Sequence, residues 1–297
     1  MSRTVSPSTN KPYGVARVVA AWNLPRSSFY AARQRQQQPR QPQKRGPKVH
    51  NDEELIAEIR VLLSESVFRG EGYRKIWARL RHKGIRTSKD RVLRLMREHQ
   101  LLSPWRQPEA GRTNPHEGTI VTEAPNQMWG TDATATFTDA EGAVTIFAAI
   151  DHYTAECVGI HAVKKGTRFE ALEPIRQAVN EYFGGFAARI AAGLQLRHDH
   201  GSVYMSDHFQ GELQFLGIES SPAFVRQPEG NGCIERFFRT LKEQLLWVQR
   251  FRNLAELRAG LSLFRSRYNQ HWILHRLGYR TPVQARQDFS VEFNTAA

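Results

Sequence analysis

Near the amino end of the chain, apolar residues recur at helical spacing and predict two short helices over residues 14–35. The first has one apolar side, formed by Val15, Val18, Val19 and Trp22. Pro25 suits the first turn of the second helix, which exposes Arg26 and Ser28. This is the layout of a helix-turn-helix, whose second helix enters a DNA major groove, although any pair of antiparallel helices shows the same spacing.

Residues 51–102 continue the helical spacing and predict a unit of three more helices. Asn51 and Glu54 can cap the first, which buries Leu55, Ile56, Ile59, Leu62 and Leu63. The second runs over about 73–83 and ends at Gly84. The third begins after Thr87, which forms a capping box with Asp90.

From about residue 125 the pattern changes from helical spacing to alternation, which predicts strands. The run NQMWGTDATATFTD places Gly130 and Asp132 on one face of a strand and Trp129 and Thr131 on the other. A turn, DAEG, leads to a second strand, VTIFAAID, and a third follows as CVGIHAV. These three strands predict an antiparallel meander.

The remaining elements alternate between helices and strands. A helix is predicted over about 168–183, a strand at LQLRHD, a helix over about 206–217, a short strand at IESSPAF and a single helix over CIERFFRTLKEQLLW. This order predicts an α/β fold with a ribonuclease H-like mixed sheet and flanking helices, preceded by an all-α region of helix-turn-helix type.

Charge divides the chain in the same place as the hydrophobic pattern. Of its 297 residues, the first 118 contain 24 Lys and Arg against 10 Asp and Glu, whereas the remaining residues contain 18 against 19. A basic front part joined to a near-neutral domain is typical of a protein that grips nucleic acid, and a merely soluble basic surface is the alternative. The Gln, Pro and basic run over residues 33–48 has nothing apolar to bury and predicts a linker.

Several classes of protein are disfavoured. The two cysteines, Cys157 and Cys233, are too far apart for a CxxC pair and too few for a usual zinc site, so we expect both to be reduced. There is no apolar run of membrane-spanning length and no apolar segment of a signal peptide at the amino end. The sequence therefore predicts a cytoplasmic protein with no membrane partner.

Three acidic residues stand out in the near-neutral part. Asp132 lies inside an otherwise uncharged strand, where a half-buried carboxylate is costly unless a cation or hydrogen-bond donors compensate it. Asp199 ends the fourth strand, and Glu235 follows it with 35 residues between them. Glu235 also fits a helix ion pair with Arg239 and Lys242. If the three acids converge at one edge of the sheet, they are suited to Mg²⁺, which prefers carboxylate oxygens and a substrate phosphate.

The motifs together resemble the OrfB-type transposases of bacterial insertion sequences, which share the retroviral-integrase catalytic core and its Asp, Asp, 35 residues, Glu signature. GYRKIWARLRHKGIRTSKDRVLRLMREHQLL resembles the helical DNA-binding module of that family. NQMWGTD, DHGSVYMSDHF and PEGNGCIERFFRTLKEQ resemble the three segments that carry its acids, and YNQHWILHRLGYRTP resembles its closing segment, with Trp272 and Ile273 where an Arg-Pro pair is frequent. The front part has no cysteine, unlike the zinc domain of retroviral integrases.

The resemblance implies a domain order and a set of functional residues. We expect a helix-turn-helix over residues 1–35, a linker over 36–50, a helical DNA-binding module over 51–105, a second linker over 106–122, a catalytic core over 123–250 and a carboxyl-terminal helical segment over 251–297. The catalytic and metal-binding acids fall on Asp132, Asp199 and Glu235, and the loop before Gly232 corresponds to one that admits DNA. The resemblance also makes Lys242 a contact to the element end. The charge and spacing of the basic helices add the candidate DNA contacts Arg239, Arg236, Arg91, Arg94, Arg97, Arg74, Lys75, Arg26 and Ser28, and an ordinary solvated face is the alternative for the row Arg91, Arg94 and Arg97.

The function implied is metal-dependent DNA cleavage and strand transfer, with two Mg²⁺ ions, or Mn²⁺ in their place, during catalysis. The partners implied are the terminal inverted repeats of the element, target DNA, further copies of the chain on that DNA and a small helix-turn-helix protein encoded upstream. Two alternatives stay open: a DNA-binding regulator or inactive transposase remnant, and another ribonuclease H-like nuclease.

The stretch LRHDHGSVYMSD contains four residues that could hold a metal ion. Alternation turns His198 and His200 away from the side of Asp199, so these histidines are predicted to support the site or face DNA. Asp207 is predicted to be a cap or a first-turn acid of the following helix. Asp199 alone has the spacing of a catalytic acid.

Overall fold

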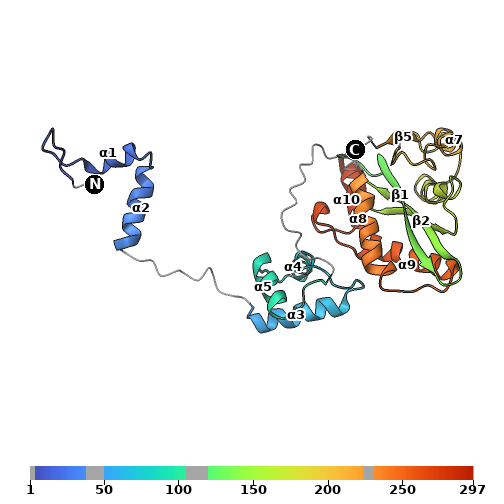
Figure 1. The fold of residues 1–297 in the computed structure, drawn as a ribbon, viewed down its shortest axis with the longest axis horizontal. Helices are drawn as coiled ribbons and strands as arrows, with labels where there is room; N and C mark the ends of the chain where they lie inside the picture. Colours follow the sequence, from blue (N-terminus) through green and yellow to red (C-terminus); the bar gives the residue numbers. More distant parts are fainter. Residues whose placement is uncertain (1–3, 38–49, 105–119, 224–230, 297) are drawn as a thin grey trace. The chain divides into compact units, whose positions relative to one another are not determined.

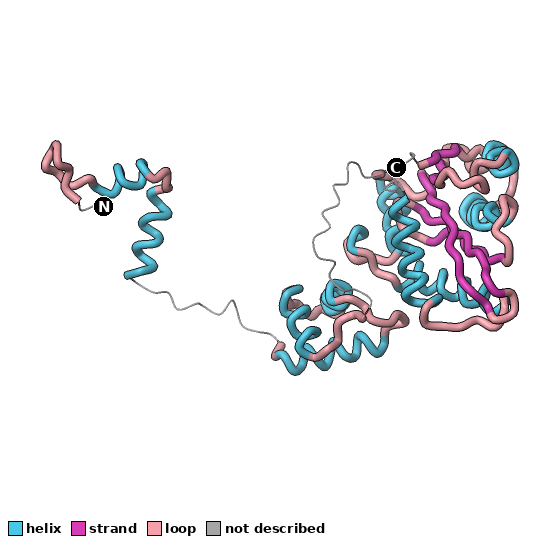
Figure 2. Tube along the Cα trace, viewed as in Figure 1, coloured by secondary structure: helices cyan, strands magenta, loops and turns pink. Residues whose placement is uncertain are grey.

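The computed structural model describes residues 4–37, 50–104, 120–223 and 231–296. The chain forms two compact units, residues 1–51 and residues 52–297. The first unit contains α1 (Gly14–Ala21) and α2 (Arg26–Gln37), separated by a turn in which Asn23 has φ +51° (Figures 1 and 2). The two short helices predicted there are confirmed. Most of the predicted linkers and the loop before Gly232 lie outside the described residues.

The second unit begins with a helical module made of α3 (Asp52–Glu65), α4 (Tyr73–His82) and α5 (Lys89–Glu98). Its core contains Leu55, Ile56, Ile59, Leu62, Ile76, Leu80, Val92, Leu95 and Met96. Gly84 follows α4 with φ +81°, a left-handed conformation that glycine adopts without strain and that ends the helix as predicted. The predicted cap of α5 was wrong by one residue, because the Ser88 side chain, and not that of Thr87, accepts the hydrogen bond from the Arg91 amide.

A five-stranded sheet with the order β3-β2-β1-β4-β5 forms the centre of the rest of the second unit. β1 (Met128–Thr138), β2 (Gly142–Asp151) and β3 (Cys157–Val163) form the predicted antiparallel meander. β4 (Gln195–His198) and β5 (Glu219–Pro222) lie parallel to β1 on its other side. This mixed order is that of a ribonuclease H-like sheet, so the predicted fold class is confirmed.

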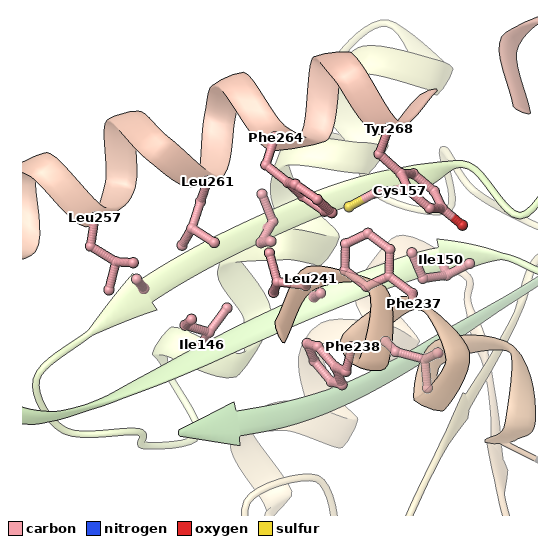
Figure 3. Packing of buried hydrophobic residues seen from close by; sticks show 14 of the residues in the cluster. Ile146, Ile150, Cys157, Phe237, Phe238, Leu241, Leu257, Leu261, Phe264 and Tyr268 are labelled. Atoms are coloured by element: carbon pink, nitrogen blue, oxygen red, sulfur yellow. The ribbon is translucent and has the colours of Figure 1, made fainter. Parts of the chain in front are cut away.

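Helices cover both faces of the sheet. One face packs against η1 (Glu170–Leu172), α6 (Glu173–Phe183) and α7 (Asp207–Leu216), in a core that includes Trp129, Ile175 and Phe209. The other face packs against α8 (Gly232–Leu241) and α9 (Leu254–His271). Figure 3 shows Leu257, Leu261, Phe264 and Tyr268 of α9 directed toward the sheet, with Phe237, Phe238 and Leu241 of α8 in the same cluster. Asp132 and Gly130 lie on this second face, because they pair directly with Ala148 and Ile150 of β2.

The helix that carries Glu235 is shorter than predicted. α8 ends at Leu241 and continues as a π-helix, η3 (Lys242–Leu246). Such segments are rare and occur often at functional sites. The chain then forms α9, the short η4 (His275–Leu277) and α10 (Pro282–Ala296). No helix in the described part of the chain is long and apolar enough to cross a membrane.

Candidate active site

Asp132 and Asp199 occupy equivalent positions on neighbouring parallel strands. In the register of β1 with β4, Gly130 pairs with Arg197, and each acid lies two residues beyond its member of that pair. β4 ends at His198, so Asp199 is the first residue past the strand, whereas β1 continues through Asp132. Neighbouring strands are about 4.8 Å apart. The two acids therefore lie on the same side of neighbouring strands, beside the carboxyl end of β4.

Asp132 is half-buried, and its charge is poorly compensated. Its Oδ1 accepts a hydrogen bond from the Ala133 amide at 2.7 Å, which favours the ionised form. Burial, assisted by the negative charges of Asp199 and Glu235, nevertheless raises the pKa of Asp132 to about 6, against the attraction of Lys242. Asp132 therefore interacts electrostatically with both of the other predicted acids.

Asp199 is exposed in a tight turn after β4. Its Oδ1 accepts a hydrogen bond from the Gly201 amide at 2.8 Å, and a Cβ on residue 201 would lie 2.8 Å from the same oxygen. A glycine at position 201 thus lets the turn close against the carboxylate. Asp207 is the first residue of α7 and Ser206 provides its cap, so the prediction of a first-turn acid there is confirmed.

The two histidines beside Asp199 have different environments. His198 is fully buried, with Nδ1 at 2.6 Å from the Asp199 carbonyl oxygen and Nε2 at 2.9 Å from Ser220 Oγ. Its ring stacks on that of Tyr204, and burial lowers its pKa, so it is a neutral group that fixes the backbone of Asp199. His200 is exposed. His198 therefore does not face solvent, which leaves only His200 accessible to DNA.

Glu235 lies in the first turn of α8, on the face of the sheet that also carries Asp132. It is exposed, as are Arg236 and Arg239 in the same helix. Arg239 Nε donates to Glu243 Oε1 at 2.8 Å, so the nearby cation that the sequence offered to Glu235 has another carboxylate as its partner. Lys242 begins the π-helix and is close enough to Asp132 to lower the pKa of that carboxyl.

The three acids have the donor chemistry of a divalent-cation site. Carboxylates that repel one another, as at Asp132, are stabilised when a cation lies between them. Within the described ranges, however, no three His, Cys, Asp or Glu side chains are gathered closely enough to hold a metal ion. Both observations hold together, because Coulomb interactions extend several ångströms beyond ligand distances.

Comparisons with known proteins show what the chain resembles. A family model described as an HTH-like domain matches residues 50–109, and one described as an integrase core domain matches residues 216–282, which include Glu235. The chain is 26% identical over 286 residues to the transposase for insertion sequence element IS629 of Shigella sonnei, with 93% of each chain covered. It is 26% identical over 218 residues to the transposase InsD for insertion element IS2A/D/F/H/I/K of Escherichia coli, with 71% of each chain covered.

The resemblance to insertion-sequence transposases is confirmed. Among solved structures, the catalytic core domain of BIV integrase is 20% identical with a TM-score of 0.43, covering 57% of this chain and 99% of that chain. The HTLV-2 integrase catalytic core domain in complex with magnesium is 20% identical with a TM-score of 0.42, covering 55% and 98%. The fold assignment rests on the strand order of this chain itself.

Basic residues of the helical module differ in how they are used. Arg91 and Arg94 both form ion pairs with Asp52 of α3, and Arg94 also pairs with Glu98. Arg97 is exposed at the end of the same row. Arg74 donates to the Tyr73 hydroxyl at 3.2 Å. In the other unit, Arg26 and Ser28 are exposed on α2, the second helix of the predicted helix-turn-helix. The arginine row thus includes two cations that already have carboxylate partners.

A contact between the module and the closing segment was missed by the sequence analysis. Trp272 and Ile273 are buried, and the Trp272 ring meets Phe68 edge-on at 4.7 Å and lies against Lys75. Gln244 of the π-helix accepts from the Arg69 amide and donates to its carbonyl. These contacts place Lys75 against the closing segment. The only sequence signal was the departure from Arg-Pro at Trp272-Ile273.

The sequence analysis also missed His152 and Asn231, which lie beside Gly130, two residues before Asp132 in β1. A Cβ on Gly130 would lie 2.7 Å from His152 Nε2 and 3.1 Å from Asn231 Oδ1. Asn231 was hidden in the loop PEGNG, where asparagine is an ordinary turn or cap residue.

Proposed function

We propose that the chain is a transposase of a bacterial insertion sequence, a polynucleotidyl transferase that cuts DNA at the ends of its element and joins them to target DNA. The observation that carries this proposal is the equivalent register of Asp132 and Asp199 on adjoining strands, together with the electrostatic interaction of Asp132 with Glu235. The likeness to IS629 and InsD transposases along most of the chain supports the reaction class.

Asp132, Asp199 and Glu235 are the residues that would hold the metal. Two Mg²⁺ ions, or Mn²⁺ in their place, would activate the attacking oxygen and stabilise the leaving oxygen. The turn at Gly201 and the buried His198 fix the backbone of Asp199, and the strand pairing of β1 with β2 fixes that of Asp132. Hydrolysis at an element end would free a 3′-hydroxyl, which would then attack a target phosphodiester in line. The 3′-oxygen of the target strand would leave as a hydroxyl, with no covalent protein intermediate.

The basic elements would position DNA around these acids. Lys242 and Arg236 are placed on the helix that carries Glu235 or directly after it, where they can contact phosphates of the element end. Arg97 and Arg74 would add phosphate contacts from the HTH-like module, and Arg26 and Ser28 would contact DNA from α2. Cutting two ends together implies at least two copies of the chain on DNA, with the upstream helix-turn-helix protein as a further partner.

The test uses duplex oligonucleotides that carry the inverted repeats flanking the gene of this chain. Purified full-length chain should cut and join them in Mg²⁺ and not in EDTA. Asp132→Asn, Asp199→Asn and Glu235→Gln should each abolish joining, a loss of at least about a thousandfold, while gel-shift binding of the ends persists. Asp207→Asn is the matched control, because Asp207 is also an exposed acid and lies only eight residues after Asp199. This variant should retain full activity.

The alternatives give different products. Binding without cleavage by the wild-type chain would indicate a regulator or an inactive remnant. Cleavage without joined products would indicate another ribonuclease H-like nuclease. Joining by any one of the three acid variants would remove that residue from the proposed metal site.

A further inference from the structure

Two buried polar atoms lie beside Gly130, two residues before Asp132. The His152 and Asn231 side chains are each 7% exposed, yet His152 Nε2 and Asn231 Oδ1 make no hydrogen bond with any described residue. A Cβ on residue 130 would lie 2.7 Å from His152 Nε2 and 3.1 Å from Asn231 Oδ1, closer than ordinary van der Waals contact in both cases. Buried polar atoms without partners are costly, so two of them facing the same point call for an explanation.

Asn231 also departs from the usual behaviour of a helix cap. It is the N-cap residue of α8, a position where asparagine normally accepts a hydrogen bond from the first turn of its own helix. Here its side chain makes no cap bond, and its Nδ2 donates to the Thr131 carbonyl oxygen in β1 at 3.3 Å. The side chain is therefore directed to the strand that carries Asp132, at the expense of the helix that carries Glu235.

His152 is held rigidly on the opposite side. Its backbone amide donates to the Met128 carbonyl at 2.9 Å, and its carbonyl accepts from Arg276 at 2.8 Å. Burial lowers the pKa of His152 to about 4, so the ring is neutral near pH 7 and one of its nitrogens carries a proton. A neutral ring with the proton on Nε2 is a donor for the Asn231 oxygen.

We propose that His152 Nε2 and Asn231 Oδ1 form a hydrogen-bonded link across Gly130, closed by one water molecule, that holds the start of α8 against β1. Water can accept from the Nε2–H group and donate to Oδ1, and such bridges are nearly as favourable as direct bonds. With the Asn231 bond to Thr131, the link ties the helix of Glu235 to the strand of Asp132 at two points. His152 and Asn231 are positioning residues, and Gly130 is required because a side chain there would separate them.

The first experiment measures hydrogen–deuterium exchange of peptides spanning α8 in the full-length chain, without metal or DNA. His152→Ala should speed exchange roughly fivefold, the factor for one net hydrogen bond, and Asn231→Ala should speed it more, because it also removes the bond to the Thr131 carbonyl. Because both remove the same link, the double variant should exchange no faster than the faster single variant. Gly130→Ala should have the same effect with both polar residues present, and His152→Asn, which keeps an N–H donor, should restore most of the protection.

The matched control is His161→Ala, which removes a half-buried histidine from β3, and it should leave α8 unchanged. Exchange in α8 that stays within about twofold of wild type in His152→Ala and in Gly130→Ala, or additive effects in the double variant, would overturn the link.

The second measurement rests on the proposed function. In strand-transfer assays, His152→Ala should lower turnover roughly tenfold while leaving the affinity for element ends unchanged, because it displaces Glu235 without touching DNA contacts. Turnover equal to wild type would contradict the positioning role. A wild-type chain without any strand transfer would overturn the proposed function, whereas the exchange result would still stand or fall by itself.

Discussion

The two sides of the sheet, β3 at one edge and β4 with β5 at the other, are built differently. At the β3 end, side chains occupy the outward backbone groups: Arg265 donates to the carbonyls of Cys157 and Val158, Arg258 donates to that of Ala162, and Asn269 bonds both backbone groups of Cys157. At the other end, β4 and β5 have four residues each and stop beside Asp199. Because its outer backbone groups already have side-chain partners, the β3 edge resists pairing with another strand. The short strands β4 and β5 leave the Asp199 carboxylate at the surface. The β3 side of the sheet is thus tied down by side-chain contacts, and the β4–β5 side leaves an acid accessible to solvent.

The largest change in stability is expected at β3, where the strand packs most tightly against α6. A Cβ on Gly159 of β3 would lie 2.0 Å from the Pro174 carbonyl oxygen, a backbone atom of α6 that cannot move alone. Gly159→Ala should therefore destabilise the fold by about 3 kcal/mol and lower Tm by roughly 6 °C or more, measured by thermal unfolding. Gly211→Ala in α7, where a Cβ would meet nothing within 4 Å, should instead raise stability by about 0.5–1 kcal/mol. Equal changes in Tm for Gly159→Ala and Gly211→Ala would contradict the contrast between the two sides of the sheet.

The next effect concerns the covered edge of β3. Arg265→Ala would leave the Cys157 and Val158 carbonyls without their guanidinium partner and should cost about 1–3 kcal/mol in denaturant unfolding. Arg252→Ala is the control, because its ion pair with Glu256 involves a side chain that is 85% exposed, and it should change stability by less than about 0.5 kcal/mol. If both variants unfold at the wild-type midpoint, the edge contacts contribute nothing.

A smaller change in stability, of opposite sign, is expected at Asp132. Because the pKa of Asp132 is raised from 3.8 to about 6 in the folded chain, the folded state binds its proton more tightly than the unfolded state does. Stability should therefore fall as pH rises from about 4 to about 6, and Asp132→Asn should remove that loss. Without metal at pH 7.5 the variant should melt roughly 2–4 °C above wild type, and the difference should vanish near pH 4. A variant that melts below wild type at pH 7.5 would show that the carboxylate is stabilised in the apo fold.

The smallest effect is expected at His200. This side chain is exposed next to Asp199, so His200→Ala should shift Tm by less than about 1 °C and leave Mg²⁺ binding, measured by calorimetry, unchanged. A tenfold loss of Mg²⁺ affinity would make His200 a ligand and change the assignment of this stretch.

The sequence predicted the parts of the fold that have a strong period. Alternation identified β1 to β3, and helical spacing identified α3 to α5, because each element buries one continuous face. Spacing and resemblance pointed to the three acids, but their roles stay a prediction. Local caps were less accurate, as Ser88 in place of Thr87 shows, since neighbouring hydroxyl residues have similar propensities.

The parts that escaped prediction depend on contacts between distant segments. Nothing in the helical spacing of residues 233–247 reveals that α8 changes to a π-helix at Lys242, where Gln244 bonds Arg69. The same is true of His152 and Asn231, which are far apart in sequence and meet only because β1, β2 and α8 converge at Gly130. Such residues carry no period and no motif of their own.

The ion pairs of Asp52 change how the HTH-like module should respond to salt. Each cation that reaches a phosphate releases condensed counterions, so the slope of log affinity against log salt counts such contacts, at about 0.9 per phosphate for duplex DNA. Arg91 and Arg94 already form ion pairs with Asp52, and Arg94 also pairs with Glu98, so both would have to exchange a carboxylate for a phosphate before contributing. The module should therefore show a shallower salt dependence than its row of arginines suggests, and Asp52→Asn should steepen it.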